Sequence, residues 1–332
     1  MTKPRILSGV QPTGNLHLGN YLGAIRNWVG LQDSHECLFM LADLHAITVP
    51  QNPADLTRNT RETAAAYIAC GIDPARSVIF PQSAVSMHAE LAWILNCHTP
   101  LGWLNRMTQF KEKSGTQKDN ALLGLYAYPV LMAADILGYH ATHVPVGADQ
   151  KQHLELARDI AGAFNRAYGE EFFPLPQPII LPTAARIMSL TDGTKKMSKS
   201  EPSDYSRITL TDDADAIANK IKKAQTDSEP SLSFDEANRP SVANLLTIYA
   251  ALEGSTPQQV AEKFSSLKTG QFKAQLAELA VAKLAPITAR MRELMADTAM
   301  LDALLKTGAE RARTIAAPIL AETMQRVGFL RV

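Results

Sequence analysis

Three lysines, Lys195, Lys196 and Lys199, stand within five residues of one another between a glycine and a proline, Gly193 and Pro202. Clustered ammonium groups of this kind can bind the oxygens of a polyphosphate, and the flanking residues favour a loop. A solvated basic loop is the commoner explanation of such a run. The chain contains neither the G-x-x-x-x-G-K-[ST] pattern nor the G-x-G-x-x-G pattern, so the run is not a P-loop or a dinucleotide fingerprint.

A second segment that could bind phosphate is the turn at residues 11–20, which follows an apolar run and precedes a helical pattern. A turn of this kind places backbone N–H groups and a helix N-terminus at the carboxyl edge of a sheet, where an anion is favoured. His17 and Asn20 can reach forward as polar groups, and Gly19 allows a flat base to approach the backbone. A turn that carries a surface histidine is the alternative.

One carboxylate, Asp135, interrupts an otherwise apolar segment. We expect a helix over residues 129–137, with Pro129 in its first turn. Spacings of three and four residues place Tyr128, Met132 and Asp135 on one face of that helix. A carboxylate in such surroundings needs a hydrogen-bond donor. Either an Arg or Lys from elsewhere in the chain supplies it, or a ligand N–H or O–H does.

The predicted strand at residues 142–146 leads into a polar segment that contains Asp149. Alternation places Val144 and Val146 on the same face of this strand. Asp149 and Gln152 form a pair of the capping-box type, which would explain the aspartate structurally. The carboxyl end of a strand is also where a ligand ribose can be held, so both interpretations stay open.

The elements that must position these residues change character along the chain. Short apolar runs alternate with helical patterns in the first half, and after residue 207 the pattern is almost purely helical. The predicted strands are residues 5–10, 37–42, 77–80 and 142–146, and the main helices between and after them are residues 18–31, 53–70, 87–97 and 150–168. A proline-rich stretch, residues 173–182, breaks the alternation. We therefore predict an α/β fold with a Rossmann-like doubly wound parallel sheet, followed by an all-helical domain.

Composition limits the class of protein more than it identifies the function. The 332 residues include 33 Lys and Arg and 33 Asp and Glu, so the net charge does not point to a polyanionic partner. With 46% hydrophobic and 20% charged residues, the chain is neither disordered nor fibrous. Residues 121–139 contain Asp135 and a proline, so we expect buried core there and not a membrane span.

The cysteines and histidines point to no metal site and to a reducing compartment. The three cysteines are widely spaced and form no C-x-x-C pair, and His140 and His143 lack a third ligand nearby. The first residues contain no apolar segment typical of a signal peptide. We therefore expect a cytoplasmic protein with reduced thiols and without a protein-bound metal.

The motifs taken together resemble the class I aminoacyl-tRNA synthetases. The segments His17-Leu18-Gly19-Asn20 and Lys196-Met197-Ser198-Lys199-Ser200, about 180 residues apart, are similar to the paired HIGH and KMSKS signatures of that class. Longer strings at residues 43–48, 107–113, 128–137 and 144–153 resemble the bacterial tryptophanyl family. This resemblance implies a catalytic domain at residues 1–205 and a helical anticodon-binding domain at residues 206–332, whose last helices could pack back on the catalytic domain.

The resemblance also implies which residues form the site. The tryptophan pocket would consist of Leu7, His45, Tyr128, Met132, Asp135, Val144, Val146 and Gln150, with Asp135 accepting from the indole N–H. ATP would be held by Gln11, Pro12, Thr13, His17, Gly19, Asn20, Gly147, Ala148, Asp149, Ile187, Lys196, Met197, Ser198, Lys199 and Ser200. The catalytic groups would be Gln11, Lys113, Lys196 and Lys199. Leu7, Leu44 and Ala148 depart from the residues that are frequent in the family at these positions.

The activity implied by the resemblance is a two-step ligation. L-Tryptophan and Mg-ATP would give tryptophanyl-adenylate and pyrophosphate, and the tryptophanyl group would pass to the 3′-terminal ribose of tRNA(Trp). ATP and Mg²⁺ are the implied cofactors, tRNA(Trp) is the implied partner, and the chain would form a homodimer away from membranes. The alternatives are tyrosyl specificity on the same scaffold, a nucleotidylyltransferase that makes a cofactor, and a non-catalytic RNA-binding protein of synthetase type.

Overall fold

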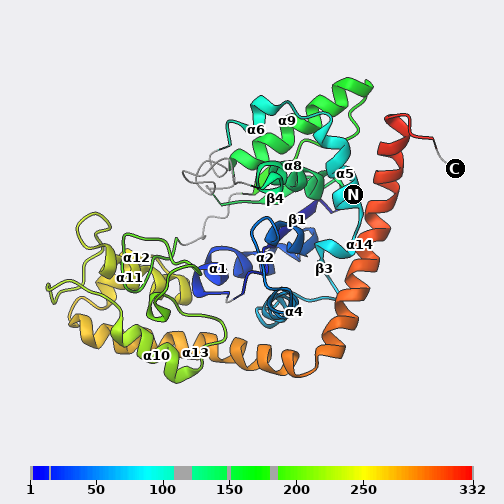
Figure 1. The fold of residues 1–332 in the computed structure, drawn as a ribbon. Helices are drawn as coiled ribbons and strands as arrows, with labels where there is room; N and C mark the ends of the chain where they lie inside the picture. The colour runs from blue at the N-terminus through cyan, green and yellow to red at the C-terminus, as the bar shows by residue number, and fades with distance from the viewer. Residues whose placement is uncertain (1–2, 15, 108–121, 148–150, 180–185, 331–332) are drawn as a thin grey trace.

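A five-stranded parallel sheet forms the centre of the computed structural model, which describes residues 3–14, 16–107, 122–147, 151–179 and 186–330 (Figure 1). The strands are β1 (Arg5–Val10), β2 (Glu36–Leu41), β3 (Val78–Pro81), β4 (His143–Pro145) and β5 (Gln177–Ile179). Their order is β3-β2-β1-β4-β5. The chain moves outward from β1 to β3 and then returns to β4 on the other side of β1. The strand order therefore reverses between β1 and β4, which confirms the predicted doubly wound sheet.

Alternation along the strands divides the core into two layers, one on each face of the sheet. Ile6, Phe39 and Ile79 belong to a cluster with residues of α2 (Arg26–Leu31) and α4 (Pro53–Ala69). Their neighbours along the same strands, such as Leu7 and Leu38, belong to a second cluster with residues of α5 (Met87–Asn96), α8 (Leu123–Leu137) and α9 (Lys151–Tyr168). Helices thus cover both faces, as a parallel sheet requires.

Shorter elements complete the α/β part. They are α1 (Leu18–Asn20), a π-helical turn (Tyr21–Ile25), α3 (Asp43–Ala46), a 3-10 turn (Gln82–Ala84) and α6 (Leu101–Leu104). The start of α4 follows from its sequence, because the Asn52 side chain accepts from the backbone N–H groups of Ala54 and Asp55, and Pro53 occupies the first helical position.

Two predictions about local structure are wrong. Helix α8 begins at Leu123, so Pro129 lies inside the helix and not in its first turn. Apolar packing on both sides of α8 stabilises the helix despite the missing N–H of proline. The proline-rich stretch also contains a strand, β5, which pairs only with β4 among the described strands. Pro178 is tolerated because an edge strand has one side without a ladder partner.

The second half of the chain is helical, as predicted. Its elements are a 3-10 turn (Asp204–Ser206), α10 (Ala214–Lys223), α11 (Pro240–Glu253), α12 (Pro257–Lys263), α13 (Thr269–Ala296) and α14 (Thr298–Arg326). Figure 1 shows α13 running beneath α4 and α14 turning back along the β3 edge of the sheet. Gly308 allows this approach, since a Cβ there would lie 1.8 Å from the carbonyl oxygen of Ile79. Arg311 also donates to the carbonyl oxygens of Pro74 (2.8 Å) and Ser77 (3.0 Å).

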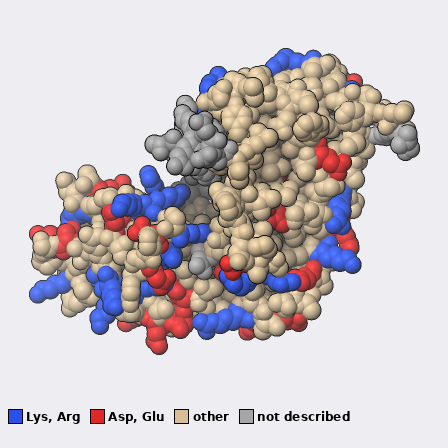
Figure 2. Space-filling view, viewed as in Figure 1, with Lys and Arg blue, Asp and Glu red and all other residues tan. Residues whose placement is uncertain are grey.

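The surface carries charges of both signs, unevenly spread. Figure 2 shows acidic and basic side chains interspersed over the helical half, whereas the upper part, where α6, α8 and α9 lie in Figure 1, is mostly uncharged in this view. Within the described residues, no helix combines the length and apolar character needed to cross a bilayer.

Candidate active site

A cavity of about 410 Å³ lies at the carboxyl ends of β1, β2 and β4. Ligands of doubly wound sheets bind at this position, where the strand order reverses. The residues that line the cavity are Leu7, Ser8, Gly9, Gln11, Met40, Ala42, His45, Tyr128, Met132, Asp135, Ile136, Val144, Pro145 and Val146. The structure thus brings together all the residues predicted for the amino-acid pocket except Gln150, which lies outside the described part of the chain.

Local periodicity explains why one helix supplies three of the lining side chains. Tyr128, Met132 and Asp135 follow one another by four and three residues on α8, and all three line the cavity, as the spacing predicted. Val144 and Val146 lie two residues apart on the strand side and also face the cavity. The cavity therefore has apolar walls from two elements and one carboxylate.

The Asp135 carboxylate is buried and accepts three hydrogen bonds from the protein. Its Oδ1 accepts from Gln82 Nε2 and from His88 Nδ1, each at 2.7 Å. Its Oδ2 accepts from His45 Nε2, also at 2.7 Å. An ionised carboxylate offers about four lone-pair sites, two on each oxygen. Among the described residues, one site on Oδ2 thus has no donor, on a residue that lines the cavity.

The three donors that Asp135 meets differ from the protein donors that were predicted for it. No described Arg or Lys pairs with it, so that half of the expectation is wrong; two histidines and a glutamine take this role. Burial by itself would raise the pKa of the Asp135 carboxyl, but the facing His45 and His88 rings hold that pKa well below its usual value. Asp135 is therefore an anion.

Sequence reasoning missed Gln82, His88 and Tyr139. Gln82 directly follows β3, and a polar residue at the carboxyl end of a parallel strand was the one signal that could have found it. His88 lies in the apolar helix α5, where a single histidine gives no distinctive pattern. Tyr139 follows the end of α8 and contacts His88 through its hydroxyl, with 2.9 Å between Tyr139 Oη and His88 Nε2.

Further contacts hold the mouth of the cavity in place. Tyr128 Oη lies 2.6 Å from His153 Nε2, and the Tyr128 ring meets the His45 ring edge to face at 6.2 Å between centroids. The backbone N–H of His45 donates to Gln82 Oε1 at 3.3 Å. The lining residues of α3 and α8 are thus held by contacts within the protein.

The turn after β1, which was predicted to bind phosphate, lies next to the cavity and forms the second part of the site. Gly14 adopts a left-handed conformation with φ of +81°, and the Asn20 side chain accepts from the backbone N–H of His17 at 3.1 Å. His17 is 5% exposed, so the alternative of a surface histidine is wrong. Burial, together with Lys199, Arg207 and Lys196, lowers the pKa of His17 to about 4. His17 is therefore uncharged at pH 7, and its buried Nδ1 has no partner among the described residues.

Gly19 packs closely on its neighbours, because a Cβ there would lie 3.0 Å from the His17 ring and would require that ring to shift. Pro12 is buried, while Gln11, Thr13 and Asn20 are half-buried. The turn thus offers a compact polar edge with a close-packed backbone. Such an edge suits the approach of a flat base and a phosphate chain.

The lysine loop lies against this turn. Lys199 Nζ donates to Thr13 Oγ1 at 3.4 Å, across 186 residues of sequence. Burial lowers the pKa of Lys199 to about 8, although Glu62 acts in the opposite direction. Met197 is buried in the core and its N–H donates to the carbonyl oxygen of Ile187 at 3.0 Å. Lys196 is exposed, Ser198 is half-buried and Ser200 is exposed. The loop is therefore held at its centre by Met197 and is not simply a solvated basic segment.

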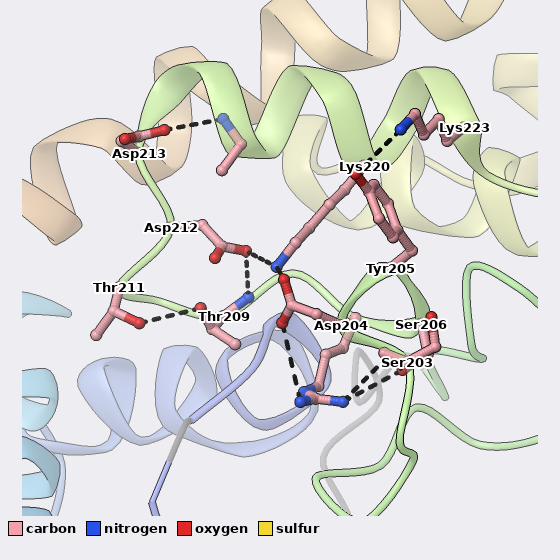
Figure 3. A network of polar contacts seen from close by, with 12 residues as sticks. Ser203, Asp204, Tyr205, Ser206, Thr209, Thr211, Asp212, Asp213, Lys220 and Lys223 are labelled. Carbon is pink, nitrogen blue, oxygen red and sulfur yellow. Dashed lines mark hydrogen bonds and ion pairs between the residues drawn. The ribbon is translucent and has the colours of Figure 1, made fainter.

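The chain that leaves the lysine loop is anchored to α10 by a network of charges (Figure 3). Lys220 is 4% exposed and lies between two carboxylates, 2.7 Å from Asp212 Oδ2 and 2.8 Å from Asp204 Oδ2. Arg207 is also buried and donates to the carbonyl oxygens of Glu201 (2.7 Å) and Ser203 (3.2 Å). This network fixes the C-terminal end of the loop relative to the helical half.

Several predicted residues cannot be placed. Lys113, Ala148, Asp149 and Gln150 lie outside the described residues, so the two interpretations of Asp149 both stay predictions. Gly147 is described and is exposed beyond the end of β4.

Comparison with known proteins decides the family. Residues 1–285 match the family of class I tRNA synthetases for W and Y. A relative named tryptophan–tRNA ligase, from Caulobacter vibrioides, is 60% identical over 329 residues, which cover 98% of this chain and 96% of the relative. The chain belongs to the tryptophan–tRNA ligase family of class I tRNA synthetases. It is therefore an aminoacyl-tRNA synthetase, as its two motifs indicated.

Solved structures agree with this family. Tryptophanyl-tRNA synthetase from Mycoplasma pneumoniae superposes with a TM-score of 0.89 at 35% identity, covering 99% of both chains. The enzyme from Campylobacter jejuni, in a complex with ADP and tryptophan, has a TM-score of 0.83 at 35% identity and covers 98% of this chain and 100% of its own. The Rossmann-like sheet with a helical C-terminal half is thus the fold of the family.

Proposed function

We propose that this enzyme ligates L-tryptophan to tRNA(Trp) through a tryptophanyl-adenylate. The observation that carries the proposal is the cavity at the strand-order reversal, with apolar walls and one anionic carboxylate that keeps a single acceptor site for a ligand donor. An indole matches this arrangement because it is flat, apolar and carries one N–H. The Campylobacter jejuni relative binds tryptophan and ADP, which supports the same assignment here.

In the amino-acid half of the site, Asp135 Oδ2 accepts from the indole N–H. Met132, Val144 and Val146 form the apolar walls of the pocket, and Leu7 packs against the indole beside them. Tyr128, together with Gln150, orients the α-amino group, and His45 borders the pocket. The carboxylate of the substrate then points toward Gln11 and the turn after β1.

In the nucleotide half, the turn after β1 and the segment at Gly147 hold the adenosine of Mg-ATP, with Asp149 on the ribose. Lys196 and Lys199, together with Lys113, meet the phosphates. The substrate carboxylate attacks the α-phosphorus in line and pyrophosphate leaves, and in the second step a ribose hydroxyl of the tRNA takes the acyl group and AMP leaves. This chemistry requires alignment and charge stabilisation, which backbone donors, lysines and the Mg²⁺ of the nucleotide provide without a covalent intermediate on the protein.

The enzyme also has two domains, forms a homodimer and works in the cytoplasm. Residues 1–205 form the catalytic domain and residues 206–332 bind the anticodon of tRNA(Trp). Exposed leucines on α6 and at the start of α8, Leu101, Leu122 and Leu123, support a homodimer through this face. The three free cysteines suit the reducing cytoplasm.

The test is ATP–pyrophosphate exchange measured with each of the common amino acids, with tyrosine as the critical competitor. We expect exchange with L-tryptophan and little with tyrosine. Asp135→Ala removes the acceptor and should abolish tryptophan-dependent exchange, with circular dichroism and the melting temperature showing that the protein stays folded. The exposed aspartate Asp159 on α9 provides the matched control, as Asp159→Ala. Near-wild-type exchange by Asp135→Ala would rule out the assignment.

A further inference from the structure

Asp135 is held by a chain of buried side chains that continues behind the cavity. His88 is fully buried and does not line the cavity, but its Nδ1 lies 2.7 Å from Asp135 Oδ1 and its Nε2 lies 2.9 Å from Tyr139 Oη. Tyr139 is fully buried as well. His88 therefore contacts the amino-acid pocket only through Asp135.

The direction of the hydrogen bonds in this chain follows from the charge of Asp135. An ionised carboxylate can only accept, so His88 Nδ1 carries the hydrogen that it donates to Oδ1. The other ring nitrogen, Nε2, is paired with the Tyr139 hydroxyl at 2.9 Å. The ring is also clamped by stacking on Phe80, with 6.0 Å between centroids and 22° between planes. The position of the His88 ring, and the hydrogen on its Nδ1, are thus determined by its neighbours.

This arrangement decides which oxygen of Asp135 meets a ligand. Gln82 and His88 together occupy both lone-pair sites of Oδ1, while His45 occupies one site of Oδ2. We propose that His88, oriented by Tyr139, is a positioning residue for amino-acid selection that restricts Asp135 to a single acceptor site on Oδ2. The inference rests on the proposed tryptophan specificity and assigns to it two residues outside the pocket.

Loss of the His88 donor has a specific consequence. Oδ1 would keep one donor and gain an open acceptor site, and the carboxylate would lose a hydrogen bond that stabilises its ionised form. The titratable groups that face this carboxylate are His45 from α3, His88 from α5 and Tyr139 after α8, with Tyr128 against His45. Without His88, Asp135 takes up a proton at a higher pH, and a neutral carboxyl is a weaker acceptor for the indole N–H than the carboxylate is.

The experiment compares His88→Leu with His88→Asn, whose amide nitrogen can replace the Nδ1 donor. Tryptophan-dependent ATP–pyrophosphate exchange is measured from pH 5.5 to pH 8, with the dissociation constant of tryptophan as a readout that needs no turnover. His98→Leu is the matched control, because His98 also contacts a tyrosine, Tyr168, at 3.2 Å, but not Asp135. Tyr139→Phe removes only the hydroxyl at the far end of the chain.

For His88→Leu we expect KM and the dissociation constant for tryptophan to rise about tenfold or more at pH 7, and further as pH falls, with kcat less affected. His88→Asn should restore most of the affinity and the flat profile of the wild type. If His88→Leu does not fold, Tyr139→Phe must show the same pH-dependent loss to a smaller degree. Wild-type profiles for His88→Leu or, in that case, for Tyr139→Phe overturn the inference. A wild-type enzyme that does not use tryptophan would instead overturn the proposed function.

Discussion

At the scale of single residues, two ionisable groups of the site have environments that set their charge before substrate binds. Asp135 is kept anionic by His45 and His88, although it is fully buried. Lys199 is the opposite case, because burial beside Thr13 weakens its ammonium form and lowers its pKa to about 8. The exposed Lys196 has no comparable burial. The two lysines of the loop are therefore not equivalent.

This difference predicts a pH dependence for ATP binding. Lys199 carries a charge below pH 8 and loses it as pH rises through that value, so KM for ATP should rise up to about tenfold between pH 7.5 and pH 9. Lys199→Arg keeps its charge throughout this range and should give a flat profile. The measurement is KM for ATP in the exchange assay at several pH values. The same rise in Lys199→Arg would show that another group is responsible.

At the scale of secondary-structure elements, the lysine loop depends on contacts at both ends. Its centre is held through Met197 and Ile187, and its C-terminal end through the charges around Lys220 on α10. Asp212 is largely buried and also accepts from the N–H of Thr209 at 2.8 Å. Lys220 thus neutralises a carboxylate that water reaches only in part (Figure 3).

Removing this lysine leaves a nearly buried carboxylate without its cation. We expect Lys220→Ala to lower the free energy of unfolding by about 3 kcal/mol, measured by urea denaturation. Lys223→Ala on the same helix is the matched control. Lys223 is exposed and contacts the Tyr205 hydroxyl at 3.0 Å, so its removal should cost less than about 1 kcal/mol. Equal effects of the two substitutions would contradict a special role for the buried network.

At the scale of the whole molecule, α14 joins the helical half to the sheet. It leaves the end of α13 and packs along β3, with Gly308 against Ile79 and Arg311 bonded to the segment before that strand. Leu101 on α6 and Leu122 and Leu123 at the start of α8 are exposed. Tyr126 Oη donates to the carbonyl oxygen of Leu101 at 3.3 Å, so α6 lies beside the start of α8 and the exposed leucines belong to neighbouring segments.

If the face that carries these leucines is the interface of the proposed dimer, placing charges on it should dissociate the dimer. We expect the double variant Leu101→Glu, Leu123→Glu to sediment as a monomer in analytical ultracentrifugation, where the wild type sediments as a dimer. Met300→Glu, at a partly exposed apolar position on α14, is the control and should stay dimeric. An unchanged sedimentation coefficient for the double variant would place the interface elsewhere.

The sequence by itself determined most of the local structure and the three pocket residues that share one face of α8. Four strands were predicted to within one residue at each end, because alternation and chain punctuation are local properties. The common face of Tyr128, Met132 and Asp135 follows from helical periodicity in the same way. Residues whose local signals conflict with their environment were not predictable: Pro129 is inside α8 and Pro178 is in β5 because packing and an edge position tolerate them.

Only the tertiary structure decided how Asp135 is satisfied. Its donors come from three other elements, 90, 53 and 47 residues away in the sequence. Periodicity carries no information about such partners, because they are set by how α3, α5 and the turn after β3 pack around the end of α8. The same holds for Lys199 and Thr13, which meet across 186 residues. The sequence thus indicates which groups can do the chemistry, and the packing of distant elements sets their charge and their free acceptor sites.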